Sequence, residues 1–321
     1  MVQRRVNAEI QRQIRYALKG NRRAISKLIS LAENDPHGRF EILSKLYWQA
    51  TEAHVIGITG PPGCGKSTLI SQLAKQYRKS GRKVGIVAVD PSSQITGGAL
   101  LGDRIRMGDL AADSNVFIRS MATRGNIGGI ARATEDAVRI LQSVNMDYVI
   151  VETAGAGQSD VDVKSLGDTI IVTTAPGLGD EIQALKAGIM EIGDIYVVNK
   201  ADRENADQAA REIYSAITMT EKKGEWNPRV LKTIATTGDG IEALTEAIRQ
   251  HSEYLDNRRH THKDATERLR SEIMDAACRY FTEVSLDKLE SSKEFTHLLS
   301  EVEKRRIDPY TAGRKLAQMK A

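Results

Sequence analysis

Short apolar runs alternate with longer helical or glycine-rich stretches between residue 54 and about residue 238. Some runs are continuously apolar, as in Tyr148-Val149-Ile150-Val151, which is typical of strands that helices cover on both faces. The runs predict strands at His54–Thr59, Lys83–Val89, Val116–Ser120, Tyr148–Val151, Thr169–Thr173, Asp194–Val198 and Arg229–Ile234. This alternation predicts an α/β fold with a doubly wound, mostly parallel sheet flanked by helices. Ligands of such sheets bind beyond the carboxyl ends of the strands, so the residues after each run are candidates for chemistry.

Helical patterns precede and follow this region. The first extension, from about residue 8 to residue 50, has helical spacing of its apolar positions at Ile25, Leu28, Ile29 and Ala32. Asn34-Asp35-Pro36 interrupts that pattern, as proline does in a helix.

The second extension begins after Asn257–Lys263, a polar and basic stretch that we interpret as a linker. Helical spacing resumes at Leu269, Ile273, Ala277 and Tyr280, and helices are also predicted through Glu301–Arg306 and from Tyr310 towards Ala321. One helix cannot bury such a stripe alone, so we expect these helices to pack on the core or on another subunit. The predicted organisation is a helical extension at 1–50, a central domain at 51–256 and a helical extension at 257–321.

The composition is that of an ordinary globular protein and argues against several classes of partner. A net charge of +4 and an aromatic content of 5% give no support for nucleic-acid binding. We also find no apolar stretch long enough to span a bilayer, and no secretory signal. The only cysteines are Cys64 and Cys278. A disulfide at Cys64 would distort the glycine-rich loop around it, which favours a reducing compartment, with the cytoplasm as the default.

The loop after the first strand has the sequence G-x-x-x-x-G-K-[ST], and a helical pattern follows it. Glycines in this context let backbone N–H groups face one anion, and the helix N-terminus adds positive charge. A plain glycine-rich turn would need neither the lysine nor the hydroxyl residue. Lys66 is therefore expected to reach the terminal phosphates of a nucleoside triphosphate, and Ser67 to place its hydroxyl on Mg²⁺. The predicted nucleotide contacts here are Gly60, Pro61, Pro62, Gly63, Cys64, Gly65, Lys66, Ser67 and Thr68.

The residues after the run at 194–198 predict which base is bound. Asn199-Lys200-Ala201-Asp202 is an N-K-x-D sequence. The Asp202 carboxylate can accept from both N1–H and the N2 amino group of guanine, whereas adenine offers no such pair of donors. We expect Asn199 to tie the loops together and the stem of Lys200 to cover the base. A solvated helix start is the common alternative. Ala235, Thr236 and Thr237 resemble a further base-contacting loop.

The segment after the run at 148–151 begins at Glu152, where many GTPases have the aspartate of D-x-x-G. Gly155 occupies the glycine position of D-x-x-G, and its N–H would contact the γ-phosphate. The exchange of aspartate for Glu152 argues against a Ras-like pattern. Gln158 is a candidate for orienting the attacking water, although a flexible glycine-rich segment can also hold it elsewhere.

Further carboxylates follow the strands. Asp90 ends the run at 83–89, and Asp103 lies in a glycine-bounded segment downstream. A carboxylate at a strand end is often structural, but Asp90, Asp103 and Glu152 can converge with Ser67 on one magnesium position.

The segment Thr173–Lys186 follows another strand and contains Pro-Gly and Gly-Asp steps. Its plain interpretation is a strand–helix connection with Asp180 as the helix N-cap. Its place at the nucleotide edge also suits a switch that reports nucleotide state to a partner.

Taken together, GPPGCGKST, VDPSS, GALLGDRIRM, ETAGAGQSD, PGLGDEIQALK and NKAD resemble the MeaB/ArgK/MMAA group of metallochaperone-type P-loop GTPases, over essentially the whole chain. The resemblance implies a chaperone for an adenosylcobalamin-dependent acyl-CoA mutase, usually methylmalonyl-CoA mutase, which gates cofactor delivery and protects the mutase. It also implies GTP/GDP and Mg²⁺ as ligands, and slow hydrolysis that the mutase accelerates. A homodimer through the helices after about residue 262 is implied as well, with Asp180 and Lys186 as functional positions of a third switch.

Other functions stay open at this stage. A nickel-insertion GTPase needs thiolate or imidazole ligands. The only close histidine pair is His260 and His262, on a basic stretch. A small-molecule kinase would need an acceptor pocket with a base beside the γ-phosphate, and no sequence feature identifies one. The sequence does not distinguish methylmalonyl-, isobutyryl- and hydroxyisobutyryl-CoA mutases as partners.

Overall fold

The computed structural model describes residues 2–51, 53–90, 107–122, 129–153, 163–177, 189–218, 226–259, 262–285 and 289–318. Asp103, Gly155, Gln158, Asp180 and Lys186 lie outside these residues.

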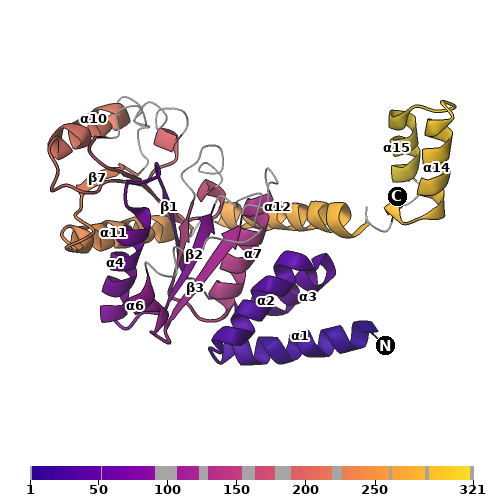
Figure 1. Ribbon diagram of the computed structural model, residues 1–321, viewed down its shortest axis with the longest axis horizontal. Helices are drawn as coiled ribbons and strands as arrows, with labels where there is room; N and C mark the ends of the chain where they lie inside the picture. The colour runs from indigo at the N-terminus through magenta and orange to yellow at the C-terminus, as the bar shows by residue number, and fades with distance from the viewer. Residues whose placement is uncertain are drawn as a thin grey trace.

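The described residues form a seven-stranded parallel sheet in the order β3-β2-β4-β1-β5-β6-β7 (Figure 1). The strands are β1 (His54–Thr59), β2 (Val84–Asp90), β3 (Val116–Ala122), β4 (Tyr148–Glu152), β5 (Thr169–Thr174), β6 (Ile195–Val198) and β7 (Arg229–Lys232). The predicted parallel α/β sheet is confirmed. Since all strands run the same way, their carboxyl ends meet at one edge, with the loop after β1 at its centre.

The last predicted strand is shorter than its apolar run. The run extends to Ile234, but β7 ends at Lys232. Ile234 instead makes an isolated antiparallel bridge to Asp239, with its N–H 3.0 Å from the Asp239 carbonyl oxygen. The bridge closes a turn over residues 235–238 and so holds this loop at the sheet edge.

Helices cover both faces of the sheet. Their bounds are α1 (Val2–Leu18), α2 (Arg22–Asn34), α3 (Pro36–Leu46), α4 (Lys66–Lys79), α6 (Gly108–Ala111), α7 (Gly129–Ser143), α10 (Ala206–Thr218), α11 (Ile241–Arg259), α12 (His262–Tyr280), α14 (Lys293–Glu303) and α15 (Pro309–Gln318). Short helical turns are η1 (Tyr47–Gln49), η2 (Val163–Ser165), η3 (Ile189–Glu191) and the π-helix η4 (Phe281–Ser285). Helices α1, α2, α3 and α7 pack on one face, and α4, α6 and α11 on the other.

The N-terminal extension belongs to the main core. The predicted stripe of α2 is fully buried and shares one apolar cluster with Val87 of β2 and Phe117 of β3. The Asn21 side chain caps α2, accepting a hydrogen bond from the Ala24 N–H at 3.0 Å. The break expected at Asn34–Pro36 separates α2 from α3.

The C-terminal extension differs from its prediction in two places. The linker interpretation of Asn257–Lys263 is wrong, because α11 continues to Arg259 and α12 begins at His262. Asn257 and Arg258 are exposed at the end of α11. The helix through Glu301–Arg306 also ends early, at Glu303. Arg305 adopts a left-handed conformation (φ 55°), and the Arg305 and Arg306 N–H groups bond back to the Val302 and Glu301 carbonyls.

Helix α12 extends away from the sheet, and the α14–α15 hairpin stands clear of the body at its far end (Figure 1). No helix among the described residues is long and apolar enough to cross a membrane.

Candidate nucleotide-binding site

The loop between β1 and α4 is fixed by two close backbone approaches. Gly60 has φ +140°, and a Cβ there would lie 1.9 Å from the Thr173 carbonyl oxygen. Gly65 has φ +96°, and a Cβ there would lie 2.4 Å from Nδ2 of Asn199. Only glycine fits at either position, so the loop must curl closely over the ends of β5 and β6.

Lys66 begins α4 with its side chain folded into this loop. It is 7% exposed, and its Nζ donates to the carbonyl oxygens of Gly60 at 2.7 Å and Pro61 at 3.2 Å. Among the described residues Lys66 forms no ion pair. Neutral carbonyls do not cancel its charge, so a cation lies at the N-terminus of a helix, which is a favourable place for phosphate.

Cys64 contributes its backbone to the same loop. The side chain is fully buried, and this burial raises the pKa of the Cys64 thiol. A thiol with a raised pKa stays protonated at neutral pH and is a poor nucleophile. The Cys64 carbonyl accepts a hydrogen bond from Asn199 Nδ2 at 2.9 Å.

Ser67 and Glu152 come together from α4 and the end of β4. Ser67 Oγ donates to Glu152 Oε1 at 2.8 Å, and Glu152 is 7% exposed. Asp90 is the last residue of β2, whose Ala88 pairs with Glu152, so its backbone lies at the same edge. A hydroxyl and a carboxylate are hard oxygen donors of the kind that Mg²⁺ takes, and triphosphate oxygens and water would complete six ligands. No group of three or more His, Cys, Asp or Glu side chains able to hold a metal occurs within the described part of the chain.

Asn199 joins three segments of the nucleotide edge. It is 2% exposed, and while Nδ2 donates to the loop at Cys64, Oδ1 accepts from Thr233 Oγ1 and the Ala235 N–H, both at 3.1 Å. The predicted tying role of Asn199 therefore has a definite geometry. Thr233 is a partner that the motif did not identify, because nothing in its sequence context distinguishes it from any other residue after a strand.

The neighbouring residues present polar groups at the surface. Lys200 has φ 55° and donates from Nζ to the Gly63 carbonyl at 2.6 Å. Asp202, Thr236 and Thr237 are exposed, whereas Ala235 is buried. The Lys200 side chain thus lies against the phosphate loop, and Asp202 follows two residues later in the chain.

Together the fold and this edge define a P-loop GTPase. The sequence model of the family described as methylmalonyl-CoA mutase-associated GTPase MeaB matches residues 25–286, and the chain belongs to that family. The chain binds and hydrolyses GTP.

Relatives support this membership over most of the chain. A Pyrococcus horikoshii protein is 46% identical over 299 residues, covering 92% of this chain and 93% of that protein. The GTPase ArgK of Escherichia coli is 36% identical over 250 residues, 75% of each chain. The mouse protein named methylmalonic aciduria type A homolog, mitochondrial, is 34% identical over 252 residues, 73% of this chain and 60% of that one. A crystal structure described as a LAO/AO transport system kinase superposes with a TM-score of 0.67 at 26% identity, covering 97% of both chains.

Proposed function

We propose that this GTPase serves an adenosylcobalamin-dependent acyl-CoA mutase, with methylmalonyl-CoA mutase as the first candidate. In this proposal it gates delivery of the cofactor and protects the mutase from inactivation. The observation that carries the proposal is the family match over residues 25–286, because the family is described as mutase-associated. The name of the mouse relative points to the same metabolism.

The nucleotide edge suggests a role for each residue. Lys66 would leave the Gly60 and Pro61 carbonyls for the β- and γ-phosphates, and Gly155 would contact the γ-phosphate. Ser67 and Glu152, with Asp90 and Asp103, would hold Mg²⁺. When bound, the ion neutralises charge that develops on the phosphate oxygens. Gln158, Asp180 and Lys186 are proposed to act in water positioning and switching.

Asp202 is proposed to select guanine. Its exposed carboxylate lies beside Lys200, whose stem crosses to the phosphate loop. Asp202→Asn should weaken GDP binding and reduce the preference for GDP over ADP, because the amide presents only one acceptor to the two guanine donors. Calorimetric titration with both nucleotides measures this, and an unchanged preference would remove Asp202 from the base site.

The C-terminal extension is proposed to form a homodimer. The apolar residues Leu269, Ile273 and Met274 of α12 are 50%, 67% and 57% exposed, which is unusual for a helix stripe and suits a second subunit. The two free thiols, Cys64 and Cys278, fit a reducing compartment, and we propose the cytoplasm.

The protective role can be tested through the lifetime of the mutase. The activity of purified methylmalonyl-CoA mutase would be followed during prolonged turnover alone, with this protein and GTP, and with the Lys66→Ala variant and GTP. We expect the wild-type protein to prolong activity and the variant to fail, because Lys66 is the cation of the phosphate loop. Equal decay in the three samples would contradict the proposal for this mutase, and the isobutyryl- and hydroxyisobutyryl-CoA enzymes would be compared in the same way.

A further inference from the structure

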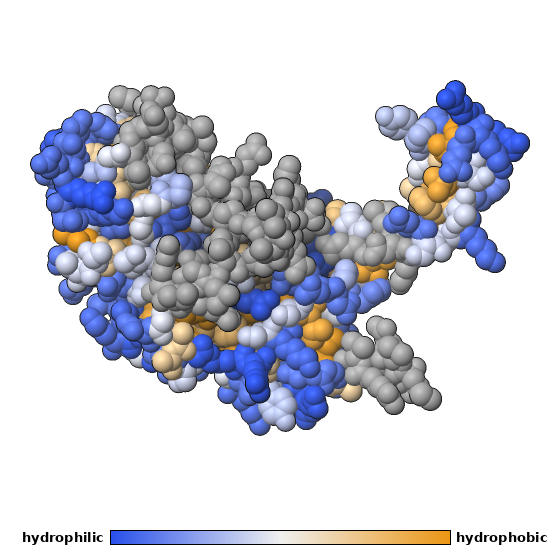
Figure 2. All heavy atoms as spheres, viewed as in Figure 1, coloured by the Kyte–Doolittle hydropathy of each residue, from blue (hydrophilic) through white to orange (hydrophobic). Residues whose placement is uncertain are grey.

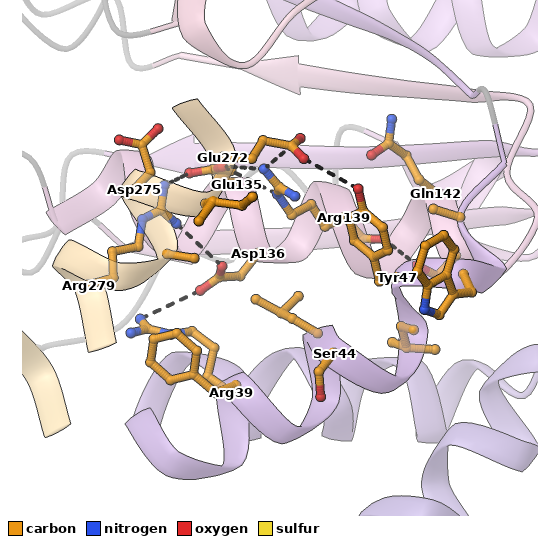
Figure 3. A pocket seen from close by; sticks show the side chains of 18 of the residues that line it. Arg39, Ser44, Tyr47, Glu135, Asp136, Arg139, Gln142, Glu272, Asp275 and Arg279 are labelled. Carbon is orange, nitrogen blue, oxygen red and sulfur yellow. Dashed lines mark hydrogen bonds and ion pairs between the residues drawn. The ribbon is translucent and has the colours of Figure 1, made fainter. Parts of the chain in front are cut away.

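A groove of about 780 Å³ lies where the two extensions meet the central domain predicted at 51–256, called the G domain below (Figure 3). Its walls come from α3 and η1 of the N-terminal extension, from α7 of the G domain and from α12 of the C-terminal extension. Phe40, Tyr47 and Trp48 supply aromatic surface, and charged residues from three helices face one another across it (Figure 3).

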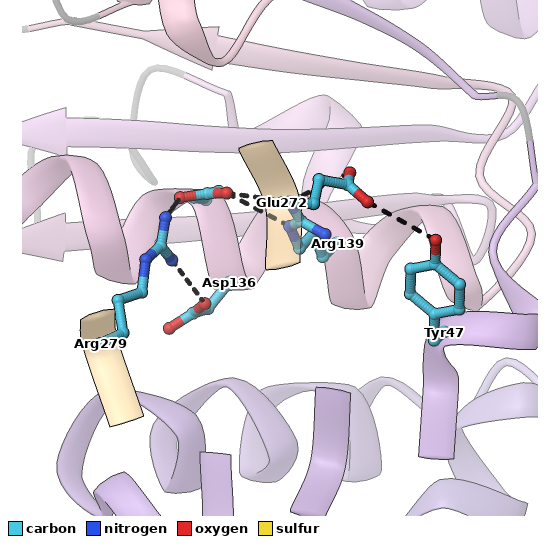
Figure 4. A network of polar contacts seen from close by, with 6 residues as sticks. Tyr47, Asp136, Arg139, Glu272 and Arg279 are labelled. Carbon is cyan, nitrogen blue, oxygen red and sulfur yellow. Dashed lines mark hydrogen bonds and ion pairs between the residues drawn. The ribbon is translucent and has the colours of Figure 1, made fainter. Parts of the chain in front are cut away.

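Six of these side chains form what we call the ionic cluster: Arg39 of α3, Glu135, Asp136 and Arg139 of α7, and Glu272 and Arg279 of α12. It holds three cations and three anions, so its formal charge is balanced. Each extension thereby contacts α7, Arg39 through Asp136 (Figure 3), and Glu272 and Arg279 through Arg139, Glu135 and Asp136 (Figure 4).

The contacts form a chain across the three helices. Arg279 pairs with Glu135, and its Nη1 lies 3.9 Å from Asp136 Oδ1. Asp136 Oδ2 lies 3.7 Å from Nη1 of Arg39. Arg139 Nη2 lies 3.0 Å from Glu135 Oε1 and 3.5 Å from Glu272 Oε1.

Asp136 is the most enclosed member. It is 1% exposed, and neither carboxylate oxygen accepts a hydrogen bond within the described residues. Burial raises the pKa of Asp136 to about 6, while Arg39 and Arg279 act to lower it. Its charge is therefore supported by one arginine from each extension. Removing one partner of such a buried charge is strongly destabilising, because the remaining charge is left uncompensated.

Among the α12 side chains that the structure describes, apolar packing adds little to the attachment of the helix. Leu269 and Ile273 line the groove but are half or more exposed, and Met274 is 57% exposed. Figure 2 shows apolar surface along α12 beside the N-terminal helices. One aromatic contact, Phe40 to Tyr280 at 5.1 Å between ring centroids, secures the end of the helix. The position of α12 thus depends mainly on charged, directional contacts.

Helix α7 connects this cluster to the nucleotide edge. It follows β3, whose carboxyl end lies at the edge that carries the phosphate loop, and Glu135 and Asp136 lie within its first two turns. A shift of α7 would move the carboxylates that hold Arg279 and Arg39.

We propose that the ionic cluster couples the nucleotide state of the G domain to the position of α12, with Asp136 as the contact point. The ion pairs of Glu272 and Arg279 with α7 are partly exposed to solvent, and Arg39 still faces Asp136 when they open, so α12 can detach and reattach while the apolar core stays intact. The inference uses the GTP site described above and does not depend on a mutase partner.

Hydrogen–deuterium exchange on the full-length protein tests this coupling. Peptides covering α12 would be compared with GDP and with a non-hydrolysable GTP analogue, in wild type, Asp136→Asn and Arg279→Gln. We expect exchange over α12 to differ between nucleotides in wild type. In both variants it should rise about tenfold or more and lose its nucleotide dependence, since local opening controls exchange.

The matched control is Arg249→Gln, which removes an exposed arginine that pairs with Glu246 and Glu253 within α11. It should exchange like wild type. If Asp136→Asn and Arg279→Gln do not fold, Glu272→Gln replaces them, because this side chain is 42% exposed and its substitution should leave the fold intact. We expect Glu272→Gln to raise hydrogen–deuterium exchange over α12 to a lesser degree. Light scattering at the same protein concentration measures the oligomeric state of each variant.

Two results would overturn the proposal. One is a nucleotide response of α12 that persists in Asp136→Asn and Arg279→Gln. The other is no response in wild type while calorimetry shows that both nucleotides bind.

Discussion

The two helical extensions have similar amphipathic sequences but attach to the G domain in different ways. In the N-terminal extension Ile25, Leu28 and Ile29 are at most 1% exposed and share one apolar core with the sheet. In the C-terminal extension Ile273 is 67% exposed, and α12 meets the body through the ionic cluster.

The difference indicates different physical roles. Apolar burial is non-directional and strong, so α1, α2 and α3 are expected to unfold only with the domain. Ion pairs between partly exposed side chains, such as Arg139 and Glu272, are weaker and more easily exchanged for water. The N-terminal extension therefore acts as part of the scaffold, whereas α12 is suited to movement and to contact with another subunit.

The largest expected effect comes from the apolar side. Leu28→Ala should lower the free energy of unfolding by about 2–5 kcal/mol, because it leaves a cavity in a fully buried cluster. Ile273→Ala, the matched change on the exposed stripe, should alter it by no more than about 0.5 kcal/mol in dilute protein that light scattering shows to be monomeric. Urea unfolding of both variants measures this. Similar losses of unfolding free energy in the two variants would contradict the difference between the two extensions. A loss in Ile273→Ala that grows with protein concentration would indicate that a second subunit covers this stripe.

A medium effect is expected from Asp136, where the C-terminal extension meets the core. Burial raises the pKa of Asp136 to about 6, above the 3.8 that is ordinary for aspartate, so between these values the folded protein takes up a proton that the unfolded chain does not. Stability from this group should rise as the pH falls from above 6 towards 4, by at most about 1.4 kcal/mol per pH unit.

The difference in unfolding free energy between wild type and Asp136→Asn isolates this contribution. The comparison is needed because Asp194 also has a pKa of about 6, while burial lowers the pKa of His251 to about 4, which has the opposite sign. If the difference in unfolding free energy does not change between pH 7 and pH 4, the pKa of Asp136 is not raised in the folded protein.

The smallest effect is expected at the rim of the groove. Glu272 contacts Arg139 at 3.5 Å and accepts a hydrogen bond from the Tyr47 hydroxyl at 3.5 Å, but both charged side chains are about 40% exposed. Glu272→Gln should lower the global free energy of unfolding by about 1 kcal/mol or less. A loss above about 2 kcal/mol in the same urea experiment would mean that the rim, too, is part of the rigid core.

Much of the fold is predictable from local pattern. Short apolar runs placed each described strand, and central strands such as β4 are continuously apolar because helices cover both of their faces. The stretch at Asn257–Lys263 misled because polar residues such as Asn257 and Arg258 occur at the ends of helices as well as in linkers. Amphipathic spacing also could not tell which stripe is covered, since Leu28 and Ile273 both lie on stripes with helical spacing and their burial depends on distant segments of the chain.

For the site, the motifs located the loops but not their connections. The phosphate-loop and N-K-x-D sequences predicted that Gly65 and Asn199 lie at one edge. The contact of Asn199 with Thr233, and that of Gly60 with the Thr173 carbonyl, depend on strand register and have no signature of their own. Asp136 was also not predicted, because an acidic residue in an amphipathic helix is normally solvated.

The rate of phosphate release from GTP, with and without an acyl-CoA mutase, tests the central claim that this is a partner-tuned GTPase. The account predicts slow release by the full-length protein alone and acceleration by more than about tenfold with its cognate mutase, as for GTPases whose transition state a partner stabilises. Lys66→Ala should release no phosphate in either case. Unchanged turnover across methylmalonyl-, isobutyryl- and hydroxyisobutyryl-CoA mutases would contradict it.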